Sequence, residues 1–397
     1  MKGNLTHKTS CLFSILVIAA FCTLILGSAR ADDSEYTVST LASFGGSSSG
    51  GNSVNNLGYV AGYSNQSDNL SRHAVVWRND ASHTLVDLGT FGGPNSSVTW
   101  NVKNNRGLIA GIAQTDTPDP LGEAWSSAAF FPGPNNVGFI CLGFVYRNGE
   151  MRALPTLGGN NGFAAGANNY GEIVGWSENT CHDPLCVPPQ VLQFRPVIYG
   201  PHNNQIRELP LFPGDSSGAA TAINDHHVAV GISGICDQAV GRYTAIHAVV
   251  WNKGMVTNIG NLGAEFWNTP TAINAQGVVV GFAGDPAYPE GDILHAFSWT
   301  RSGGLVALPA LPGHVDSEAY GVNDDGTVVG VSCDSEFIDC RGVRWDGTTV
   351  TDLNTEKQME FTDRLETAKD INDQGEITGR AISDAGVRTS YLAVPND

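Results

Sequence analysis

The chain has 397 residues, of which 39 are acidic and 21 basic, so its formal net charge is −18 at pH 7. Such an excess of acid argues against nucleic-acid binding, which needs cationic patches for the phosphates, and against docking on anionic lipid. Glycine is abundant, with 48 residues, and no long helical periodicity is present. We therefore expect an all-β protein made of short strands separated by turns.

The first 31 residues have the three parts of a secretory signal peptide. Lys2 and Lys8 form a positive n-region, residues 11–27 are apolar, and residues 29–31 (Ala-Arg-Ala) are a small-x-small cleavage site. The apolar stretch of 17 residues is short for a membrane anchor. We expect cleavage to release residues 32–397, with 18 basic and 39 acidic residues and a net charge of −21. The mature protein would be extracellular, periplasmic or held at the cell surface, without membrane insertion.

The cysteines of the expected mature chain predict disulfides, because their number is even and the chain is exported. They are Cys141, Cys181, Cys186, Cys236, Cys333 and Cys340. Close spacing favours a Cys181–Cys186 pair and a Cys333–Cys340 pair. Cys141 and Cys236 are then left to pair with each other. A metal site is the alternative, but no C-x-x-C pair is present, so we expect no metal at these cysteines.

A turn motif, Asn followed three residues later by Gly, recurs along the chain. Its copies begin at Asn55, Asn104, Asn168, Asn224, Asn274, Asn323 and Asn372. The copies are 49, 64, 56, 50, 49 and 49 residues apart, and each is followed by an apolar alternation. In the fourth copy His227 replaces the Gly. Self-similarity at this period indicates internal structural repeats.

Two further motifs complete the repeat. One is a Leu- and Gly-rich turn, such as residues 153–159 (ALPTLGG). The other is a short strand ending in an aromatic residue, as in HAVVW at 73–77 and 247–251 and HAFSW at 295–299. Because the Trp or Tyr recurs in repeat after repeat, we interpret this strand as structural, with a role in capping or bridging neighbouring units.

One repeat therefore contains four strands, which we name A to D. In the fourth repeat they are predicted at residues 221–224, 228–232, 246–251 and 255–259. Seven antiparallel four-stranded units at this period predict a seven-bladed β-propeller as a single domain of residues 32–397. A solenoid is the alternative fold.

The two ends of the mature chain favour a closed ring. Residues 36–41 form a D strand without its blade, and residues 370–394 supply A, B and C strands without a D strand. We expect the N-terminal strand to pair with residues 391–394, which removes open sheet edges. Strand A has a small residue two positions before most of the turn asparagines, as expected for a crowded innermost position. These are Ser53, Gly166, Ala222, Ala272 and Gly321, whereas Val102 and Asp370 depart from the pattern.

These motifs together resemble the HAF-repeat family of extracellular bacterial repeat proteins. His295-Ala296-Phe297 matches the tripeptide, and residues 73–75 and 247–249 are close to it. The tripeptide is lost at Phe144, Pro196 and Leu392. The resemblance covers essentially the whole mature chain and implies secretion and a propeller-like fold, but no agreed activity.

The position of the long loops predicts the working face. In an A-B-C-D meander the A–B and C–D turns lie on one face of the ring, here called the A–B face. The B–C loops and D-to-A connections lie on the other, the B–C face. The B–C loops are long, so we expect the B–C face to carry the ligand site. The predicted ligand-binding residues on it are Trp100, Trp125, Trp176, Asp215, Trp267, His314, Asp316 and Glu318. The alternative is that such residues pack the insertions onto the blades.

No sequence motif of a catalytic site is present, with no G-x-S-x-G, H-E-x-x-H or P-loop pattern. We expect no cofactor and no metal ligands, and leave only calcium open. The turn at residues 323–326 resembles part of a calcium loop but lacks its spacing. Our first hypothesis is a monomeric, non-catalytic scaffold that binds an extracellular glycan, peptide or protein. One alternative is a hydrolase or lyase acting on polysaccharide or a lactone, and another is a structural surface or matrix protein.

Overall fold

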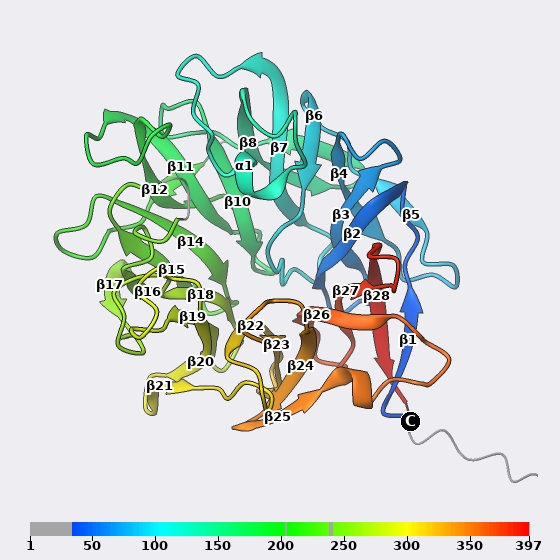
Figure 1. Cartoon of the computed structure of the whole chain (residues 1–397). Coiled ribbons are helices and arrows are strands. Elements are labelled where there is room, and N and C mark those ends of the chain that lie inside the picture. Colours follow the sequence, from blue (N-terminus) through cyan, green and yellow to red (C-terminus); the bar gives the residue numbers. More distant parts are fainter. Residues whose placement is uncertain (1–33, 203–204, 238–240, 397) are drawn as a thin grey trace, which may run out of the picture. The chain divides into compact units, whose positions relative to one another are not determined.

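The computed structural model describes residues 34–202, 205–237 and 241–396, whose regular secondary structure is almost entirely β-strand (Figure 1). The expected signal peptide lies outside these residues. Five sheets each have four antiparallel strands in chain order. The first two consist of β6 (Gly92–Ser97), β7 (Ile109–Pro118), β8 (Phe139–Arg147) and β9 (Glu150–Ala153), then β10 (Gly162–Ala167), β11 (Ile173–His182), β12 (Leu192–Tyr199) and β13 (Ile206–Glu208). The next three consist of β14 (Ser217–Ile223), β15 (Ala229–Gly234), β16 (His247–Asn252) and β17 (Met255–Asn258), then β18 (Thr269–Ile273), β19 (Val279–Gly284), β20 (Leu294–Thr300) and β21 (Gly304–Ala307), then β22 (Asp316–Val322), β23 (Val328–Cys333), β24 (Cys340–Asp346) and β25 (Thr349–Asp352).

The remaining strands form one eight-stranded sheet. It contains β2 (Gly45–Val54), β3 (Val60–Gln66), β4 (Arg72–Trp77) and β5 (Leu85–Asp87), together with β26 (Arg364–Ile371), β27 (Ile377–Ile382), β28 (Arg388–Pro395) and β1 (Tyr36–Thr40). A single parallel pair, Ser48 with Arg388, joins β2 to β28. Division at this pair would give the two remaining four-stranded units that the repeats predict, although the number of seven blades stays a prediction.

The N-terminal strand completes the last set of strands, as the sequence predicts. β1 pairs antiparallel with β28, with Tyr36 opposite Pro395 and Thr40 opposite Tyr391. The all-β propeller is thereby closed on itself. The two short helices, α1 (Ser127–Phe130) and the 3₁₀-helix η1 (Leu353–Thr355), lie in connections between strands.

The hydrophobic core lies between the faces of neighbouring sheets. One cluster, for example, joins Val174 and Ile198 of one sheet to Ala220, Val249 and Trp251 of the next. The innermost strands lack room for larger side chains. A Cβ on Gly166 would lie 3.1 Å from the Cα atom of Ala222 in the next sheet. The small residues of strand A therefore mark the crowded centre, as expected.

The HAVVW strand is structural. The indole Nε1 of Trp77 donates to the carbonyl oxygen of Ala42 at 2.8 Å. Trp251 donates in the same way to Pro210, and Trp345 to Pro309. Each acceptor lies in the connection that leads from the previous sheet, so the tryptophan bridges neighbouring units, as predicted.

The histidines of these strands each contact an aspartate carboxylate through a ring nitrogen. His73 contacts Asp87 at 2.9 Å, and His295 contacts Asp285 at 2.8 Å. The third, His247, contacts Asp215 at 2.9 Å. His73 and His295 are thus held within their own repeats, whereas Asp215 lies in the connection from the previous sheet that also contains Pro210.

Two disulfides are present among the described residues, and two expected pairings, Cys181–Cys186 and Cys141–Cys236, are wrong. Cys333–Cys340 forms as predicted. The other disulfide joins Cys186 to Cys236, whereas Cys181 is exposed and free. Cys141 is buried and free. Cys186 and Cys236 are 50 residues apart, about one repeat, and lie in the B–C loops of adjacent sheets. Close spacing along the chain therefore predicted the wrong partner for Cys186, because equivalent loops of successive repeats are neighbours in space.

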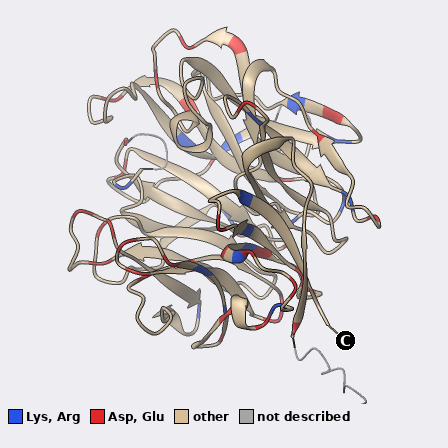
Figure 2. Ribbon diagram, turned by 45° about the vertical axis from the view of Figure 1, so that its right-hand side comes forward, with Lys and Arg blue, Asp and Glu red and all other residues tan. Residues whose placement is uncertain are grey.

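In the part of the chain that the structure describes, no helix is long and apolar enough to span a bilayer. Figure 2 shows that the acidic residues lie largely in loops and at strand ends, whereas basic residues are few.

Candidate functional site

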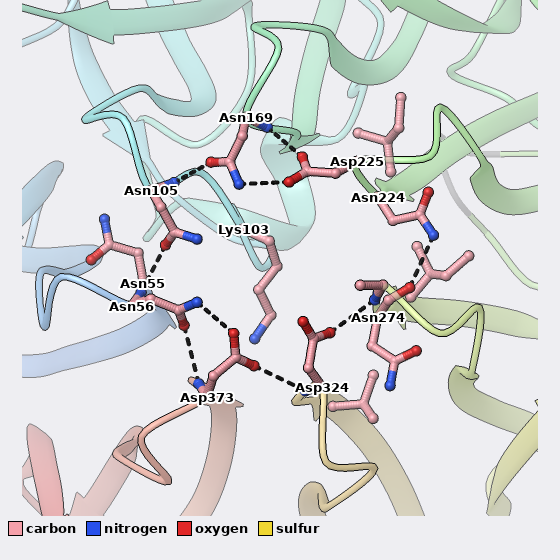
Figure 3. A pocket seen from close by; sticks show the side chains of 14 residues that line it. Asn55, Asn56, Lys103, Asn105, Asn169, Asn224, Asp225, Asn274, Asp324 and Asp373 are labelled. Carbon is pink, nitrogen blue, oxygen red and sulfur yellow. Dashed lines mark hydrogen bonds between the residues drawn. The ribbon is translucent and has the colours of Figure 1, made fainter.

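The A–B face is held by hydrogen bonds between successive turns (Figure 3). Each turn asparagine donates its side-chain amide to the carbonyl oxygen of the next one. Among the described residues the order is Asn55, Asn104, Asn168, Asn224, Asn274, Asn323 and Asn372, and Asn372 donates back to Asn55. The next residue of most turns adds a second link, as where the Asn105 carboxamide oxygen accepts from the backbone N–H of Asn56.

A cavity of about 250 Å³ lies inside this ring of turns, with Lys103 pointing into it. The Lys103 Nζ lies 2.6 Å from the buried carboxylate of Asp370. Asp370 departs from the small-residue pattern because it fits against Gly321, where a Cβ would lie 2.9 Å from its Oδ1 atom. Since the polar groups here are largely paired with one another, we interpret the A–B face as a structural closure.

A cluster of charged and aromatic residues lies deeper in the centre. Glu318 and Tyr320 of β22 share one face of their strand and are half-buried, in contrast to their buried neighbours. Lys369 of β26 is also half-buried, and its Nζ lies 3.3 Å from the centroid of the Tyr320 ring. Residues that are partly exposed on otherwise buried inner strands face the solvent of the central channel.

Tyr63 and Arg380 reach this cluster from the second strands of two units. Tyr63 of β3 lies opposite Gly50, and Arg380 of β27 lies opposite Thr367. Gly50, Thr367 and Glu318 each lie five residues before a turn asparagine. They occupy equivalent positions along the first strands of their units, so the residues of the cluster lie at a similar distance from the A–B turns. A Cβ on Gly50 would come within 2.8 Å of the Tyr63 ring, so glycine there makes room for the tyrosine.

Basic side chains surround this point. The Arg72 guanidinium stacks on the Tyr63 ring, 3.7 Å from its centroid. Arg380 Nε lies 2.6 Å from the Glu366 carboxylate, which Arg388 also contacts at 2.9 Å. Four of the 21 basic residues of an acidic chain therefore meet here, and Arg380 is at their centre.

The environment of the cluster perturbs its acid–base groups. Burial, aided by the charge of Arg380, lowers the pKa of Lys369 to about 7. Burial and the neighbouring Glu318 raise the pKa of Asp316 to about 7. Burial acts to raise the pKa of Tyr63, but Arg380 and Arg72 outweigh it, so that pKa is lowered. The cluster therefore contains groups that can exchange protons near neutral pH.

Two of the predicted site residues, Asp316 and Glu318, belong to this cluster. Asp316 is 1 % exposed and accepts the backbone N–H of Leu294 at 2.8 Å. It therefore acts on the cluster through its charge, whereas the half-buried Glu318 faces the channel.

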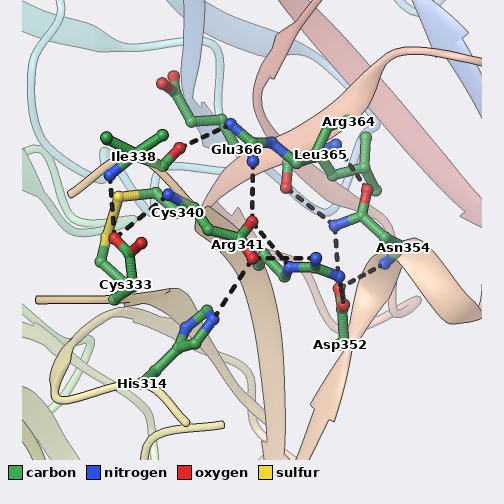
Figure 4. A network of polar contacts seen from close by, with 12 residues as sticks. His314, Cys333, Ile338, Cys340, Arg341, Asp352, Asn354, Arg364, Leu365 and Glu366 are labelled. Carbon is green, nitrogen blue, oxygen red and sulfur yellow. Dashed lines mark hydrogen bonds and ion pairs between the residues drawn. A yellow bond between two sulfur atoms is a disulfide. The ribbon is translucent and has the colours of Figure 1, made fainter. Parts of the chain in front are cut away.

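His314 belongs to a neighbouring polar network (Figure 4). Its Nε2 lies 3.8 Å from Asp339, which also contacts Arg341 at 3.0 Å and Arg364 at 2.8 Å. The Cys333–Cys340 disulfide closes the loop that carries Asp339. Because its side chain is only 9 % exposed, His314 anchors this loop and offers little surface to a ligand.

Three of the predicted tryptophans pack the insertion between β7 and β8. Trp176 is fully buried and stacks on Phe163 with ring centroids 3.9 Å apart. Trp125 of the insertion is also buried and meets Phe194 edge-on, and Trp100 meets Trp176 in the same way. Trp125 and Trp176 therefore do not present their rings to a ligand, and their role is the packing that the sequence left as the alternative.

The last two predicted residues lie apart from the cluster. Asp215 accepts from Ser233 at 2.6 Å and pairs with His247, and its side chain is 7 % exposed. It is thus a structural partner of the HAVVW strand. Trp267 is half-buried, with its backbone N–H bonded to the carbonyl oxygen of Arg242.

Of the seventeen exposed large apolar side chains among the described residues, ten lie on the loops of the B–C face. Every B–C loop presents at least one of them. They are Leu70, Leu121, Val137, Leu185, Val187, Tyr243, Tyr288, Phe337, Ile338 and Val387. Exposed apolar groups on successive loops around one face are typical of a contact surface.

The sequence held a signal for the residues that the prediction missed. Tyr63, Ile112, Trp176, Ile232, Phe282, Val331 and Arg380 occupy equivalent positions, five residues after the fourth position of each turn. Arg380 alone among them is charged. A departure from the repeat pattern at an inner position would therefore have identified it.

No family model and no curated protein matches the chain. Among solved structures it is similar to a streptogramin B lyase, with 12 % identity, a TM-score of 0.49, and coverage of 91 % of this chain and 98 % of that one. It is similar to a virginiamycin B lyase from Staphylococcus aureus at 10 % identity, with a TM-score of 0.47 and coverage of 91 % and 100 %. A Trypanosoma rangeli sialidase follows at 8 % identity, with a TM-score of 0.40 and coverage of 79 % and 56 %. At these identities we draw no conclusion about activity from the likeness.

Proposed function

We propose that this chain is an exported binding protein whose B–C face and central channel take a carboxylate-bearing glycan. The observation that carries the proposal is the convergence of three cations in the centre of an acidic protein, with Arg380 close both to Arg72, which stacks on Tyr63, and to Lys369, which lies over Tyr320. The ligand carboxylate would lie among these cations, and the rest of the glycan would extend over the B–C loops.

Electrostatics favour an anionic ligand at this point. Burial lowers the pKa of Lys369 and that of Arg72, and Arg380 lowers both further because like charges held together repel one another. An incoming carboxylate relieves that repulsion and forms charge-assisted hydrogen bonds with guanidinium groups. Glu366 already neutralises part of the charge through its two arginine contacts, which keeps the cluster folded without ligand.

Export is part of the proposal. The disulfides Cys186–Cys236 and Cys333–Cys340 fit an oxidising compartment, where such bonds persist. The signal-like segment of residues 1–31 supports the same destination.

A glycan array probed with the purified protein tests the proposal. We expect binding to glycans that contain uronic or sialic acids and weaker binding to their neutral or carboxyl-reduced counterparts. Binding only to neutral glycans would contradict the proposed role of the cations. Binding to an acidic peptide array without any glycan binding would assign the site to a different class of ligand.

An enzyme is the second candidate, and the lowered pKa of Tyr63 favours it. A tyrosinate between Arg72 and Arg380 could remove the proton next to the carboxylate of a uronic-acid unit. The electron pair would then form the C4–C5 double bond as the C4–O bond breaks, and the departing oxygen would take a proton. The unsaturated product absorbs in the ultraviolet, so a polyuronate incubated with the protein tests this activity. A constant absorbance with a bound polyuronate would leave binding as the function.

A further inference from the structure

A second group of polar residues is buried between the insertions of two neighbouring sheets, away from the channel cluster. Glu123 lies in the connection between β7 and β8, whereas Glu178 belongs to β11 and Gln190 to the loop after it. Their exposed fractions are 1 %, 0 % and 3 %. Two carboxyl groups and an amide are thus enclosed together, and this burial needs compensation.

Backbone donors and side-chain amides satisfy the hydrogen-bonding capacity of four of the six polar side-chain atoms in this group. Glu123 Oε1 accepts the N–H groups of Val191 at 2.8 Å and Leu192 at 2.7 Å. Gln190 Nε2 bridges Glu123 Oε1 at 3.1 Å and Glu178 Oε1 at 3.0 Å. These contacts hold the two carboxyl groups and the amide against one another.

Two oxygen atoms of the group are unsatisfied. Glu123 Oε2 and Gln190 Oε1 are buried and have no hydrogen-bond partner among the described residues. No ion pair within the described chain joins Glu123 or Glu178 to a basic side chain. Both free atoms are oxygen acceptors, and the nearby charge is negative. A proton shared between the two carboxyl groups would compensate Glu123, whereas a cation would compensate Glu123 and Gln190 together.

We propose that Glu123 Oε2, Gln190 Oε1 and the Glu178 carboxylate bind a calcium ion. Calcium takes carboxylate and carboxamide oxygens in flexible geometry, as this set of atoms requires. Asp119 would contribute from a second layer, because its Oδ2 accepts from Asn161 Nδ2 at 2.8 Å and that amide also contacts Glu178. The turn at residues 323–326 resembles a calcium loop in sequence, but its Asn323 belongs to the hydrogen-bonded ring of turn asparagines.

A softer metal fits this site less well. The neighbouring thiol is Cys141, whose backbone N–H bonds to Asn161. Burial raises the pKa of this thiol to about 12, so it stays protonated and is no thiolate ligand. The remaining ligands are oxygen atoms, which hard cations prefer.

The ion would join two insertions that frame the B–C face. Glu123 is followed by Trp125, which packs on Phe194 of the neighbouring sheet, and Gln190 belongs to the loop that contains Cys186. Calcium at this point would therefore fix the loops beside the proposed ligand site without touching the ligand.

Terbium luminescence tests the site, because terbium replaces calcium at oxygen sites and is sensitised by a nearby indole such as Trp125. We expect the purified protein to give a saturable signal that calcium displaces and magnesium displaces poorly. Calcium should also raise the melting temperature relative to protein in a chelator. Absence of both effects would overturn the proposal.

Two matched variants make the result specific. Glu123→Gln keeps the shape of the side chain and should weaken terbium binding by about tenfold or more. Glu336→Gln, at an exposed position outside the cluster, should leave binding unchanged. If the two carboxyl groups instead share a proton, calcium would not change the melting temperature and Glu123→Gln would be as stable as the parent. Equal terbium binding by both variants would place the ion elsewhere.

Discussion

The side-chain amide of Asn372 donates to the backbone carbonyl oxygen of Asn55 at 3.0 Å, across 317 residues of sequence. The same type of hydrogen bond links each of the six other pairs of successive turn asparagines. The last turn therefore contacts the first in the same way as each turn contacts the next one along the chain. Together with the pairing of β1 and β28, it closes the propeller. Stability therefore depends on a contact that no local segment of the chain can make alone.

Replacing Asn372 by Ala should lower the free energy of unfolding by about 1–3 kcal/mol. The change removes the hydrogen bond to the Asn55 carbonyl oxygen and the acceptor for the N–H groups of Gln374 and Glu376. Urea unfolding of both proteins measures the difference. Asn274→Ala breaks equivalent contacts and should have a similar effect, and no loss in either variant would contradict the role of the ring.

Trp251→Phe should destabilise the protein by about 1–3 kcal/mol, because it removes the hydrogen bond to Pro210 and leaves that carbonyl oxygen unpaired. Trp299 is the suitable comparison. Its ring is half-buried, and no hydrogen bond from its indole nitrogen is present in the described structure. Trp299→Phe should therefore have a smaller effect in the same thermal or urea unfolding experiment. Equal losses would show that ring volume, and not the bridge, stabilises the strand.

The cysteines should differ in their reactivity. A maleimide should label Cys181 in the native protein and reach Cys141 only after unfolding, since one is exposed and the other buried. Peptide mapping without reduction should recover Cys186 linked to Cys236. A Cys181–Cys186 peptide would contradict the structure.

The Cys186–Cys236 disulfide should contribute up to about 4 kcal/mol to stability, because it closes a long loop in the unfolded chain. Cys236→Ser should therefore lower the unfolding midpoint clearly. Cys181→Ser provides the control and should leave the midpoint unchanged.

Stability in a chelator should fall as the pH rises from about 5 to 8. Burial and the charge of Glu123 raise the pKa of Glu178 from 4.5 to about 8. The folded chain thus keeps a proton that the unfolded chain releases in this window, and the free energy of unfolding falls with pH. Glu178→Gln should make the decline shallower in urea unfolding at several pH values. A parent protein whose stability rises over this range would show that the carboxyl groups are charge-compensated without calcium.

The sequence predicted the fold well because the fold is encoded in repeated local signals. The turn asparagines, the small residues of strand A and the aromatic end of strand C each recur once per repeat, and their spacing also led to the pairing of β1 with β28. The Cys186–Cys236 pair was missed because only the curvature of the ring brings equivalent loops together.

The candidate site was harder to predict because it depends on exceptions to the pattern. Lys369 and Arg380 lie on inner and second strands, where other repeats have polar or apolar residues, and neither belongs to a motif. Trp125 and Trp176 looked like ligand-binding aromatics because sequence alone does not show that the insertion folds back onto its neighbour. The B–C face has exposed apolar groups, and its role as the ligand-binding face stays a prediction. Loop position gave no indication of the charged centre.

Isothermal titration with an acidic oligosaccharide selected from the glycan array tests the central proposal most directly, when applied to the parent protein and to two arginine variants. Arg380→Gln removes the charge at the centre of the cluster, whereas Arg301→Gln removes an exposed charge from the turn between β20 and β21 on the A–B face. Lys369→Met checks the same site through a residue without an ion pair among the described side chains. We predict that Arg380→Gln and Lys369→Met weaken binding by at least about tenfold, in line with the loss of a charge-assisted contact, while Arg301→Gln binds like the parent. Equal affinity of all four proteins would contradict the account.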